Sequence, residues 1–148
     1  MAKNERFEIF KKHGVLILPE SIAKYYHPSL DTVLIRIKDE EPEPFLFEKY
    51  YLDVLKLVFD DVSSPTPYGK LMTKEDAKKV VDFFVKHKDK KLVVHCVAGI
   101  SRSTATACAW AYYHKNQELE REIRTCPLFS PNSHVYSLLC RQIDALSI

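Results

Sequence analysis

The stretch KKLVVHCVAGISRSTATACAW (residues 90–110) places the strongest constraint on how this chain can fold. Its first part, residues 91–96, is a nearly continuous apolar run, which is typical of a strand buried on both faces of a sheet. Residues 102–115 are rich in alanine and other small residues, and they predict a helix that packs closely against its neighbours. Cys96 therefore ends a buried strand, and Arg102 begins the helix that follows it.

The remainder of the chain alternates between strand and helix patterns. Apolar, β-branched runs predict further strands at residues 14–20, 31–39 and 50–61. Further helices are predicted at residues 21–26, 74–88, 118–125 and from Pro131 to about Ala145. Ser21, Thr73 and Ser130 are expected to cap the first, second and last of these helices. This alternation predicts an α/β fold with a central, mainly parallel sheet flanked by helices on both faces. The length of 148 residues suits a single domain spanning residues 1–148.

Composition excludes several classes of function. Hydrophobic residues make up 46% and charged residues 28% of the chain, as in soluble globular proteins. It has no apolar run of about 18 residues, so we expect no membrane span. Its start lacks an apolar signal-peptide core, so we expect a cytoplasmic protein. The formal charge of +2 is too small to indicate a nucleic-acid partner.

The cysteines show no metal-binding or redox pattern. They stand at positions 96, 108, 126 and 140, and none forms a C-x-x-C pair. We expect no metal site, buried structural thiols at Cys108 and Cys140, and a loop thiol without a role at Cys126. A regulatory disulfide between Cys96 and one of these three remains an alternative.

The loop from Cys96 to Arg102 joins the carboxyl end of a strand to the start of a helix, where open α/β sheets bind ligands. Backbone N–H groups at a helix start are unpaired, and a tight loop can turn several of them towards one anion. The uncharged residues of the loop leave room for this, and we expect the phosphate-binding residues to be Val97, Ala98, Gly99, Ile100, Ser101 and Arg102. Gly99 permits the positive φ that the curl requires. The planar guanidinium of Arg102 can hold two phosphate oxygens at once.

A cysteine at the centre of such a loop is suited to nucleophilic catalysis. The field that holds a phosphate also stabilises a thiolate, so the pKa of Cys96 should lie below the free value of about 8.5. Ser103 can donate its hydroxyl to the sulfur and ease the departure of the thiolate from an intermediate. His95 is expected to orient the loop through hydrogen bonds rather than to act as an acid or base. A structural cysteine beside a capping serine would explain Cys96 alone, but not Gly99 and Arg102.

The sequence HCVAGISRSTA resembles the H-C-x5-R-S/T signature of the cysteine-dependent protein tyrosine phosphatases. Its G-x-S-R-S core resembles the form that is typical of the compact dual-specificity phosphatases. Two later segments, AYYH (111–114) and CPLFSPN (126–132), are similar to stretches of the same family, with Cys126 in place of the usual arginine. FDDVSSPTP (59–67) resembles the acid loop of relatives of the phosphatase of regenerating liver. Residues 90–146 match well, whereas residues 1–49 carry little recognisable signal.

The resemblance implies a two-step hydrolysis of phosphate esters that needs no cofactor. Cys96 takes the phosphoryl group from the substrate, and water then hydrolyses the phosphocysteine. Arg102 and the loop amides bind the phosphoryl oxygens. An aspartate protonates the leaving oxygen and later deprotonates the water.

Two neighbouring residues, Asp60 and Asp61, are candidates for this general acid. Strand parity places Asp61 on the apolar face of Leu57 and Phe59, which favours Asp61 in a desolvated site, while Asp60 would meet backbone or solvent. The resemblance to the F-D-D acid loop points to Asp61 as well. Asp60 stays the alternative acid.

The uncharged loop indicates phosphorylated protein side chains rather than phosphoinositides. Since the chain lacks the segment that deepens the pocket of larger tyrosine phosphatases, we expect phosphoserine and phosphothreonine to be accepted beside phosphotyrosine. A non-enzymatic phosphoprotein-binding module and a rhodanese-type sulfurtransferase remain alternatives. Low-molecular-weight tyrosine phosphatases and arsenate reductases place their cysteine near the N-terminus, so position 96 disfavours both.

Overall fold

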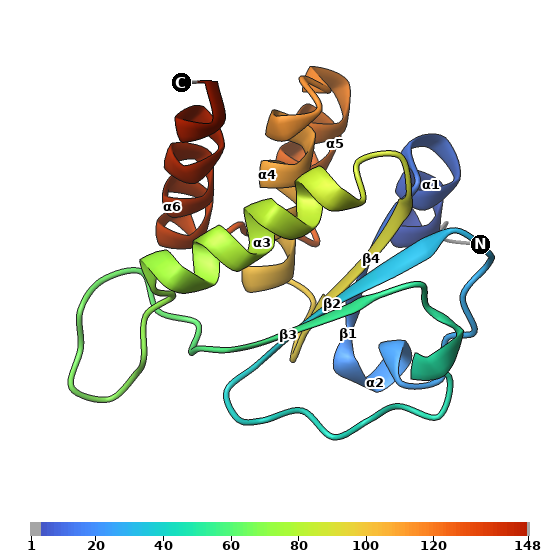
Figure 1. Ribbon diagram of the computed structural model, residues 1–148, viewed down its shortest axis with the longest axis horizontal. Coiled ribbons are helices and arrows are strands. Elements are labelled where there is room, and N and C mark those ends of the chain that lie inside the picture. Colours follow the sequence, from blue (N-terminus) through green and yellow to red (C-terminus); the bar gives the residue numbers. More distant parts are fainter. Residues whose placement is uncertain (1–3, 148) are drawn as a thin grey trace.

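A computed structural model of the chain describes residues 4–147 (Figure 1). The predicted single domain, 1–148, thus includes residues 1–3 and 148, which lie outside the described residues. The elements in chain order are α1 (Glu5–His13), β1 (Val15–Pro19), α2 (Glu20–Ala23), β2 (Thr32–Lys38), the 3-10 helix η1 (Glu48–Tyr50), β3 (Val54–Val58), α3 (Lys74–Lys86), β4 (Lys91–Cys96), α4 (Arg102–Tyr113), α5 (Gln117–Thr125), α6 (Ser133–Asp144) and the 3-10 helix η2 (Ala145–Ser147).

Four strands form one sheet in the order β1-β4-β2-β3, and all three pairings are parallel. β4 therefore lies inside the sheet, with β1 on one side and β2 on the other. The register sets Pro19 of β1 beside Cys96 and Arg36 of β2 beside His95. Because the strands are parallel, the loops that follow β1, β2, β3 and β4 all leave the same edge of the sheet.

The two faces of the sheet are covered unequally, as Figure 1 shows. α3, α4, α5 and α6 cover one face, where their apolar side chains join those of the strands in the larger core. The other face is covered by α2 and by the segment that contains η1, with Ala23, Tyr51 and Phe45 against Leu34 and Val93. The predicted α/β fold with helices on both faces is confirmed, but the second face carries only short helices.

Several element boundaries differ from the sequence prediction. Thr73 caps α3 as predicted, in a capping box with Asp76. Ser21 is not a cap, because α2 begins at Glu20 directly after Pro19. Ser130 does not cap the last helix either: the cap is Asn132, whose side chain accepts a hydrogen bond from the Val135 N–H. The strand predicted over residues 50–61 is shorter, because residues 48–50 form a 3-10 helix and the chain leaves the sheet after Val58.

Helix α1 was not predicted from the sequence. Asn4 caps it, Gly14 ends it in the left-handed conformation with φ 74°, and only Ile9 on it is fully buried. A helix of nine residues with one buried apolar side chain has a weak periodic pattern, which explains the omission. Within residues 4–147, no helix is long and apolar enough to cross a membrane.

Candidate active site

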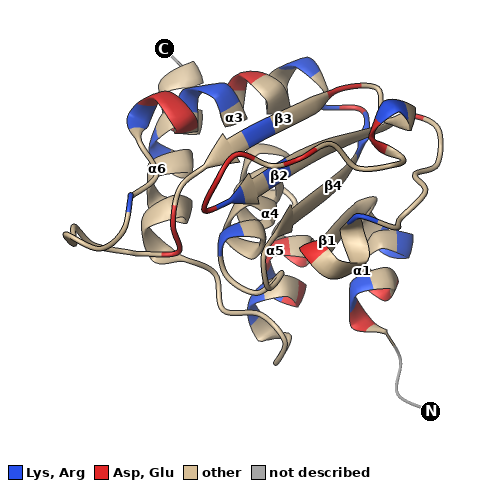
Figure 2. Cartoon of the chain, turned by 90° about the horizontal axis from the view of Figure 1, so that it is seen from below, with Lys and Arg blue, Asp and Glu red and all other residues tan. Residues whose placement is uncertain are grey.

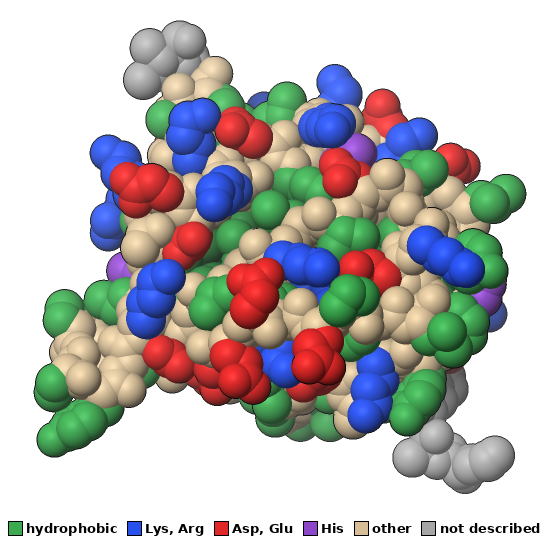
Figure 3. Space-filling view, turned by 60° about the horizontal axis from the view of Figure 1, so that its bottom comes forward, with side chains coloured by type: hydrophobic (Ala, Val, Ile, Leu, Met, Phe, Trp, Pro, Cys, Tyr) green, Lys and Arg blue, Asp and Glu red, His purple; other side chains and the backbone are tan. Residues whose placement is uncertain are grey.

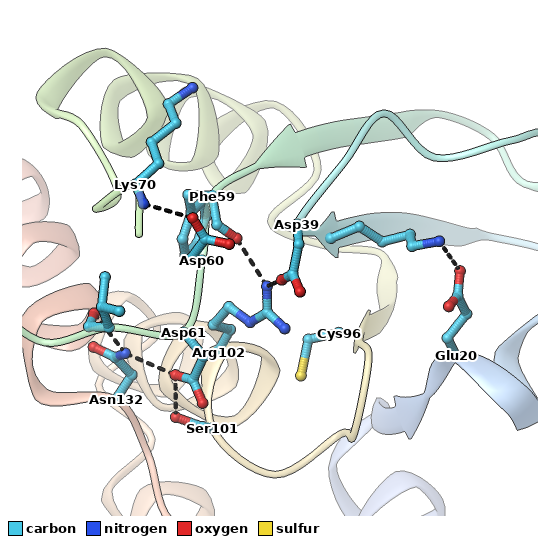
Figure 4. Close-up of polar contacts among 12 residues, drawn as sticks. Glu20, Asp39, Phe59, Asp60, Asp61, Lys70, Cys96, Ser101, Arg102 and Asn132 are labelled. Carbon is cyan, nitrogen blue, oxygen red and sulfur yellow. Dashed lines mark hydrogen bonds and ion pairs between the residues drawn. The ribbon is translucent and has the colours of Figure 1, made fainter. Parts of the chain in front are cut away.

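The loop of residues 96–102, here called the cysteine loop, curls around the sulfur of Cys96 (Figure 4). The cysteine side chain is buried at the end of β4, with 2% of its surface exposed. Its Sγ lies 3.1 Å from Ser103 Oγ and accepts a hydrogen bond from the Gly99 N–H at 3.3 Å. The sulfur therefore sits among donors that belong to its own loop and to the first turn of α4.

These donors decide the protonation of Cys96. Burial by itself raises the pKa of its thiol, but hydrogen bonds from the Ser103 hydroxyl and from the N–H groups of Ser103, Gly99 and Ile100 outweigh burial, so the pKa is lowered. Cys108 provides a comparison, since it is equally buried inside α4 and burial raises the pKa of its thiol to about 12. The difference between these two thiols lies in the N–H and O–H donors around them, and only Cys96 is suited to be a nucleophile.

The other two cysteines resemble Cys108 in this respect. Burial raises the pKa of Cys140 to about 11 and also raises the pKa of Cys126. All four cysteines are free thiols. Cys140 is half-buried rather than fully buried as predicted. Cys126 donates a hydrogen bond to Glu5 Oε2 at 2.9 Å.

The curl of the loop depends on Gly99. This residue has φ +67°, and a Cβ placed on it would come within 2.5 Å of the Pro19 nitrogen and 2.6 Å of the Leu18 carbonyl carbon. Neither backbone atom can move without disturbing β1, so both the conformation and the space require glycine here. The glycine predicted from sequence is thus fixed by two independent constraints.

Arg102 lies beside Cys96 with its guanidinium between Asp39 and the sulfur (Figure 4). Its Nη1 donates to Asp39 Oδ1 and, at 2.8 Å, to the carbonyl of Phe59. Its Nε is the one buried side-chain nitrogen or oxygen within residues 4–147 that has no hydrogen-bond partner. A buried N–H without a partner is costly, so this position suits the oxygen of an anion bound above the sulfur.

The two candidate acids lie in a segment of residues 60–70, here called the aspartate loop. Asp60 Oδ2 accepts a hydrogen bond from the Lys70 N–H at 2.5 Å, so this carboxylate is turned to backbone. Asp61 Oδ1 accepts from Ser101 Oγ at 2.7 Å and from Asn132 Nδ2 at 2.9 Å, so it lies against the cysteine loop. Asp61 is exposed rather than desolvated as strand parity suggested, because β3 ends at Val58 and the chain turns between Asp60 and Val62.

His95 belongs to a buried chain of hydrogen bonds. Arg36 Nε donates to His95 Nε2 at 3.1 Å, which leaves the ring proton on Nδ1, directed at the Cys96 carbonyl at 3.3 Å. Arg36 also donates to Glu48 Oε1 at 2.7 Å, and its guanidinium stacks on the Phe45 ring at 3.6 Å. Burial, with a smaller contribution from the Arg36 charge, lowers the pKa of His95 to about 4. The neutral imidazole is suited to orienting the loop.

Four residues at the site were not predicted from the sequence: Arg6, Arg36, Asp39 and Asn132. Asn132 lies in the SPN segment, whose resemblance to the family was a signal for it. Arg36 lies in β2 and Asp39 directly follows this strand, and only the strand order brings Arg36 to His95 and Asp39 to Arg102. Arg6 stands in the helix that was not predicted.

Comparison with known proteins gives a likeness in structure only. No protein-family model and no curated protein matches the sequence. Among solved structures, DUSP15 is 25% identical, with 90% of this chain and 85% of that chain covered and a TM-score of 0.55. Human DUSP28 is 17% identical over 90% of this chain and 94% of its own, with a TM-score of 0.55. PTPMT1 in complex with PI(5)P is 18% identical over 90% and 92%, with a TM-score of 0.58. These likenesses confirm the fold that the loop motif predicted.

Proposed function

We propose that this chain, which has the fold of the dual-specificity phosphatases in the cysteine-dependent protein tyrosine phosphatase superfamily, hydrolyses phosphate esters of protein side chains through Cys96. The single observation that carries the proposal is the buried thiol with a lowered pKa, ringed by N–H donors and placed beside the unpaired Nε of Arg102. The solved structures that resemble this chain include dual-specificity phosphatases, and this likeness supports phosphatase activity for the chain.

In the first step, the Cys96 thiolate attacks phosphorus, an S–P bond forms, and the P–O bond to the substrate oxygen breaks. Asp61 gives its proton to that oxygen, which leaves as an alcohol or a phenol. Arg102 and the N–H groups of the cysteine loop hold the three remaining phosphoryl oxygens. The contacts of Asp61 with Ser101 and Asn132 support its role, because they hold this carboxylate beside the loop.

In the second step, water attacks the phosphocysteine, and Asp61, now ionised, accepts a proton from the water. The S–P bond breaks, the electron pair returns to sulfur, and inorganic phosphate leaves. Ser103 Oγ, 3.1 Å from Sγ, donates a hydrogen bond to the sulfur as negative charge develops on it. In this cycle the protons are carried by Asp61 and water, and Arg102 and the loop N–H groups supply the positive charge that the phosphoryl group needs, so the proposed mechanism uses no metal or other cofactor.

The charges around the site support protein substrates over polyphosphorylated lipids. The side chains of Val97, Ala98 and Ile100 in the loop are uncharged. The segment after β2 is acidic, with Asp39, Glu40, Glu41 and Glu43, and Figure 2 shows it at the edge of the sheet where the cysteine loop lies. A headgroup with several phosphates would meet like charge there. On the face drawn in Figure 3, acidic and basic side chains are interspersed, unlike the basic surface that suits an anionic membrane.

Lipid phosphate is the second candidate, because PTPMT1 was crystallised with the phosphoinositide PI(5)P. A groove of about 770 Å³ adjoins Val97 and could hold the part of a substrate next to its phosphate. Its lining mixes Lys24 and Lys38 with Glu40, Glu41 and Glu43, and Lys38 is already paired with Glu20 at 2.8 Å. This balance of charges favours a peptide over the anionic headgroup of a phosphoinositide.

One set of assays tests the proposal. Purified protein should hydrolyse p-nitrophenyl phosphate in the presence of a metal chelator, and vanadate should inhibit it. Peptides with phosphotyrosine should turn over fastest, because a phenol is the better leaving group, and phosphoserine and phosphothreonine peptides should turn over measurably. Phosphopeptide binding without hydrolysis would indicate a binding module, thiosulfate turnover a sulfurtransferase, and a preference for PI(5)P a lipid phosphatase.

A further inference from the structure

Arg6 connects the first helix to the back of the cysteine loop. Its Nη1 lies 2.8 Å from the Gly99 carbonyl oxygen and 2.9 Å from the Ile17 carbonyl oxygen of β1. Nη1 carries two N–H bonds, so it can donate one to each carbonyl. The guanidinium also lies over the Phe129 ring, 5.2 Å from its centroid. One side chain of α1 thus joins a strand, the cysteine loop and the segment before α6.

This contact acts on the peptide that faces the sulfur. In a planar trans peptide, the carbonyl oxygen and the following N–H point in opposite directions. When Arg6 holds the Gly99 oxygen outwards, the N–H of Ile100 is turned inwards, and this N–H is one of the donors that lower the pKa of Cys96. The Ile17 carbonyl, fixed in the sheet, gives Arg6 a rigid anchor.

We propose that Arg6 is a positioning residue of the cysteine loop, which fixes the Gly99–Ile100 peptide so that the Ile100 N–H stays directed at the Cys96 sulfur and at a phosphoryl group bound there. The consequence for turnover rests on the proposed phosphatase function, whereas the effect on the thiol does not. Arg6 itself touches neither the sulfur nor the site of the phosphoryl group.

The surroundings of Arg6 fit this role. The side chain is half-buried between α1, β1 and Phe129. Burial lowers the pKa of Arg6, and negative charge on Cys126 and Cys96 acts in the opposite direction, so the guanidinium and the nucleophile lie within electrostatic reach. A guanidinium keeps its charge when it is buried in this way and holds its N–H bonds in a fixed plane, which a lysine does not.

The test compares Arg6→Gln with Lys11→Gln. Both substitutions remove one positive charge from α1, but the side chain of Lys11 is exposed and has no hydrogen bond or ion pair within the described residues. The first readout is the alkylation rate of Cys96 by iodoacetamide as a function of pH, measured on the Cys96 peptide by mass spectrometry so that Cys126 does not interfere. The second is kcat and KM for p-nitrophenyl phosphate. Melting temperatures of all variants are measured, and assays are run well below the lowest.

Arg6→Gln should raise the midpoint of Cys96 alkylation by about one pH unit, which corresponds to a weakened hydrogen bond to the thiolate. It should lower kcat/KM by about 10-fold, less than the roughly 10²-fold that complete loss of a donor costs. Lys11→Gln should match the wild type in both. Arg6→Lys keeps the charge without the planar fork, and it should lie closer to Arg6→Gln than to the wild type.

Two results would overturn the proposal. The first is an Arg6→Gln protein that is indistinguishable from Lys11→Gln in both readouts. The second is wild-type behaviour of Arg6→Lys beside a defective Arg6→Gln, which would show that charge alone is needed. If the wild type hydrolysed no phosphate ester, the proposed function would fail, and the alkylation midpoint would still decide the role of Arg6.

Discussion

The cysteine loop and the aspartate loop lie side by side at the same edge of the sheet, but they are held in different ways. Outward-facing carbonyls of the cysteine loop accept hydrogen bonds from distant parts of the chain: Val97 from the Glu20 N–H at 3.1 Å, Gly99 from Arg6, Ile100 from the Ser130 N–H at 2.9 Å, and Ser101 from the Asn132 N–H at 3.1 Å. Because each carbonyl is held outwards, the following N–H is turned inwards. The surrounding fold thereby directs these N–H groups to the inside of the loop, where we propose that a phosphoryl group binds.

The aspartate loop is mainly closed on itself. Asp60 and Lys70 bond through their backbone at 2.8 Å and through the Asp60 carboxylate, and Thr66 pairs with Gly69. Its tip is exposed, and Tyr68 is 95% exposed. Two residues connect this loop to the cysteine loop. Ser101 donates to Asp61 Oδ1, and Asn132 donates to Asp61 Oδ1, to the Val62 carbonyl and, through its N–H, to the Ser101 carbonyl. The cysteine loop is thus held by more long-range contacts than Asp61, the proposed acid, whose position depends on Ser101 and Asn132.

The largest expected effect is in the cysteine loop. Cys96→Ser should abolish turnover of p-nitrophenyl phosphate, because a serine hydroxyl in the same ring stays protonated and is a poor nucleophile. The ring of N–H donors remains, so the variant should still bind vanadate or phosphopeptide, as measured by calorimetry. Cys126→Ser, which changes a half-buried thiol outside the ring, serves as the control and should keep full activity. Substantial turnover by Cys96→Ser would rule out the nucleophile.

The next effect tests the aspartate loop. Asp61→Asn should lower kcat by about 10²-fold and flatten the alkaline limb of the pH–rate profile, since the wild-type rate falls as the acid loses its proton. The loss should be larger for alkyl phosphates, whose leaving group needs the proton more. Asp60→Asn is the matched control, because an asparagine oxygen can still accept from the Lys70 N–H. If Asp60→Asn flattens that limb and Asp61→Asn keeps it, the two roles are exchanged.

A smaller effect distinguishes the two steps within the cysteine loop. Ser103→Ala removes the hydroxyl 3.1 Å from Sγ, which is one of the donors that lower the pKa of Cys96, so this pKa should be higher than in the wild type. Breakdown of the phosphocysteine should slow by about 10-fold, the value of one hydrogen bond to a charged group. Rapid-mixing experiments should then show a burst of nitrophenol followed by slower turnover. Equal slowing of both steps would mean that Ser103 is structural.

Contacts between residues close in sequence were predictable. The strand, the loop and the helix around Cys96 follow from one continuous segment, and so does the Thr73 cap of α3. Ser130 was a plausible cap by residue type, but its backbone N–H is bonded to Ile100 and Asn132 also bonds the aspartate loop, so tertiary contacts moved the start of α6. The local preference for a capping residue predicts the wrong residue here, because Ser130 and Asn132 also form hydrogen bonds with loops that are distant in the sequence.

The side-chain contacts that hold the cysteine loop and His95 in place could not be predicted either, because they join residues far apart in the sequence. Arg6 meets Gly99 across 93 residues, and Arg36 meets His95 across 59. Either contact requires the strand order β1-β4-β2-β3, which hydrophobic patterns do not specify. Arg36 stands in a run of apolar residues, where a buried arginine is unusual, and that position was the one local sign of its role.

The smallest expected effect concerns His95, beneath the cysteine loop, and it is seen in stability rather than turnover. Burial lowers the pKa of His95 from 6.5 to about 4, so the unfolded chain binds a proton more readily than the folded one. The neutral imidazole of His95 therefore contributes its full stabilisation of the folded state above pH 6.5, and this contribution is lost as the pH falls from 6.5 towards about 4. Between pH 7 and pH 5.5, His95 should account for a loss of about 1 kcal/mol in the free energy of unfolding.

Urea unfolding at these two pH values measures the loss. His95→Asn removes the titrating ring and should reduce the pH dependence by that amount, whatever the stability of the variant itself. The reason lies in Arg36: a proton on His95 Nε2 would face the guanidinium Nε at 3.1 Å, donor against donor. An unchanged pH dependence in His95→Asn would mean that the pKa of the imidazole is the same in the folded and unfolded chains, and the hydrogen-bond chain from Arg36 to the Cys96 carbonyl would have to be reassigned.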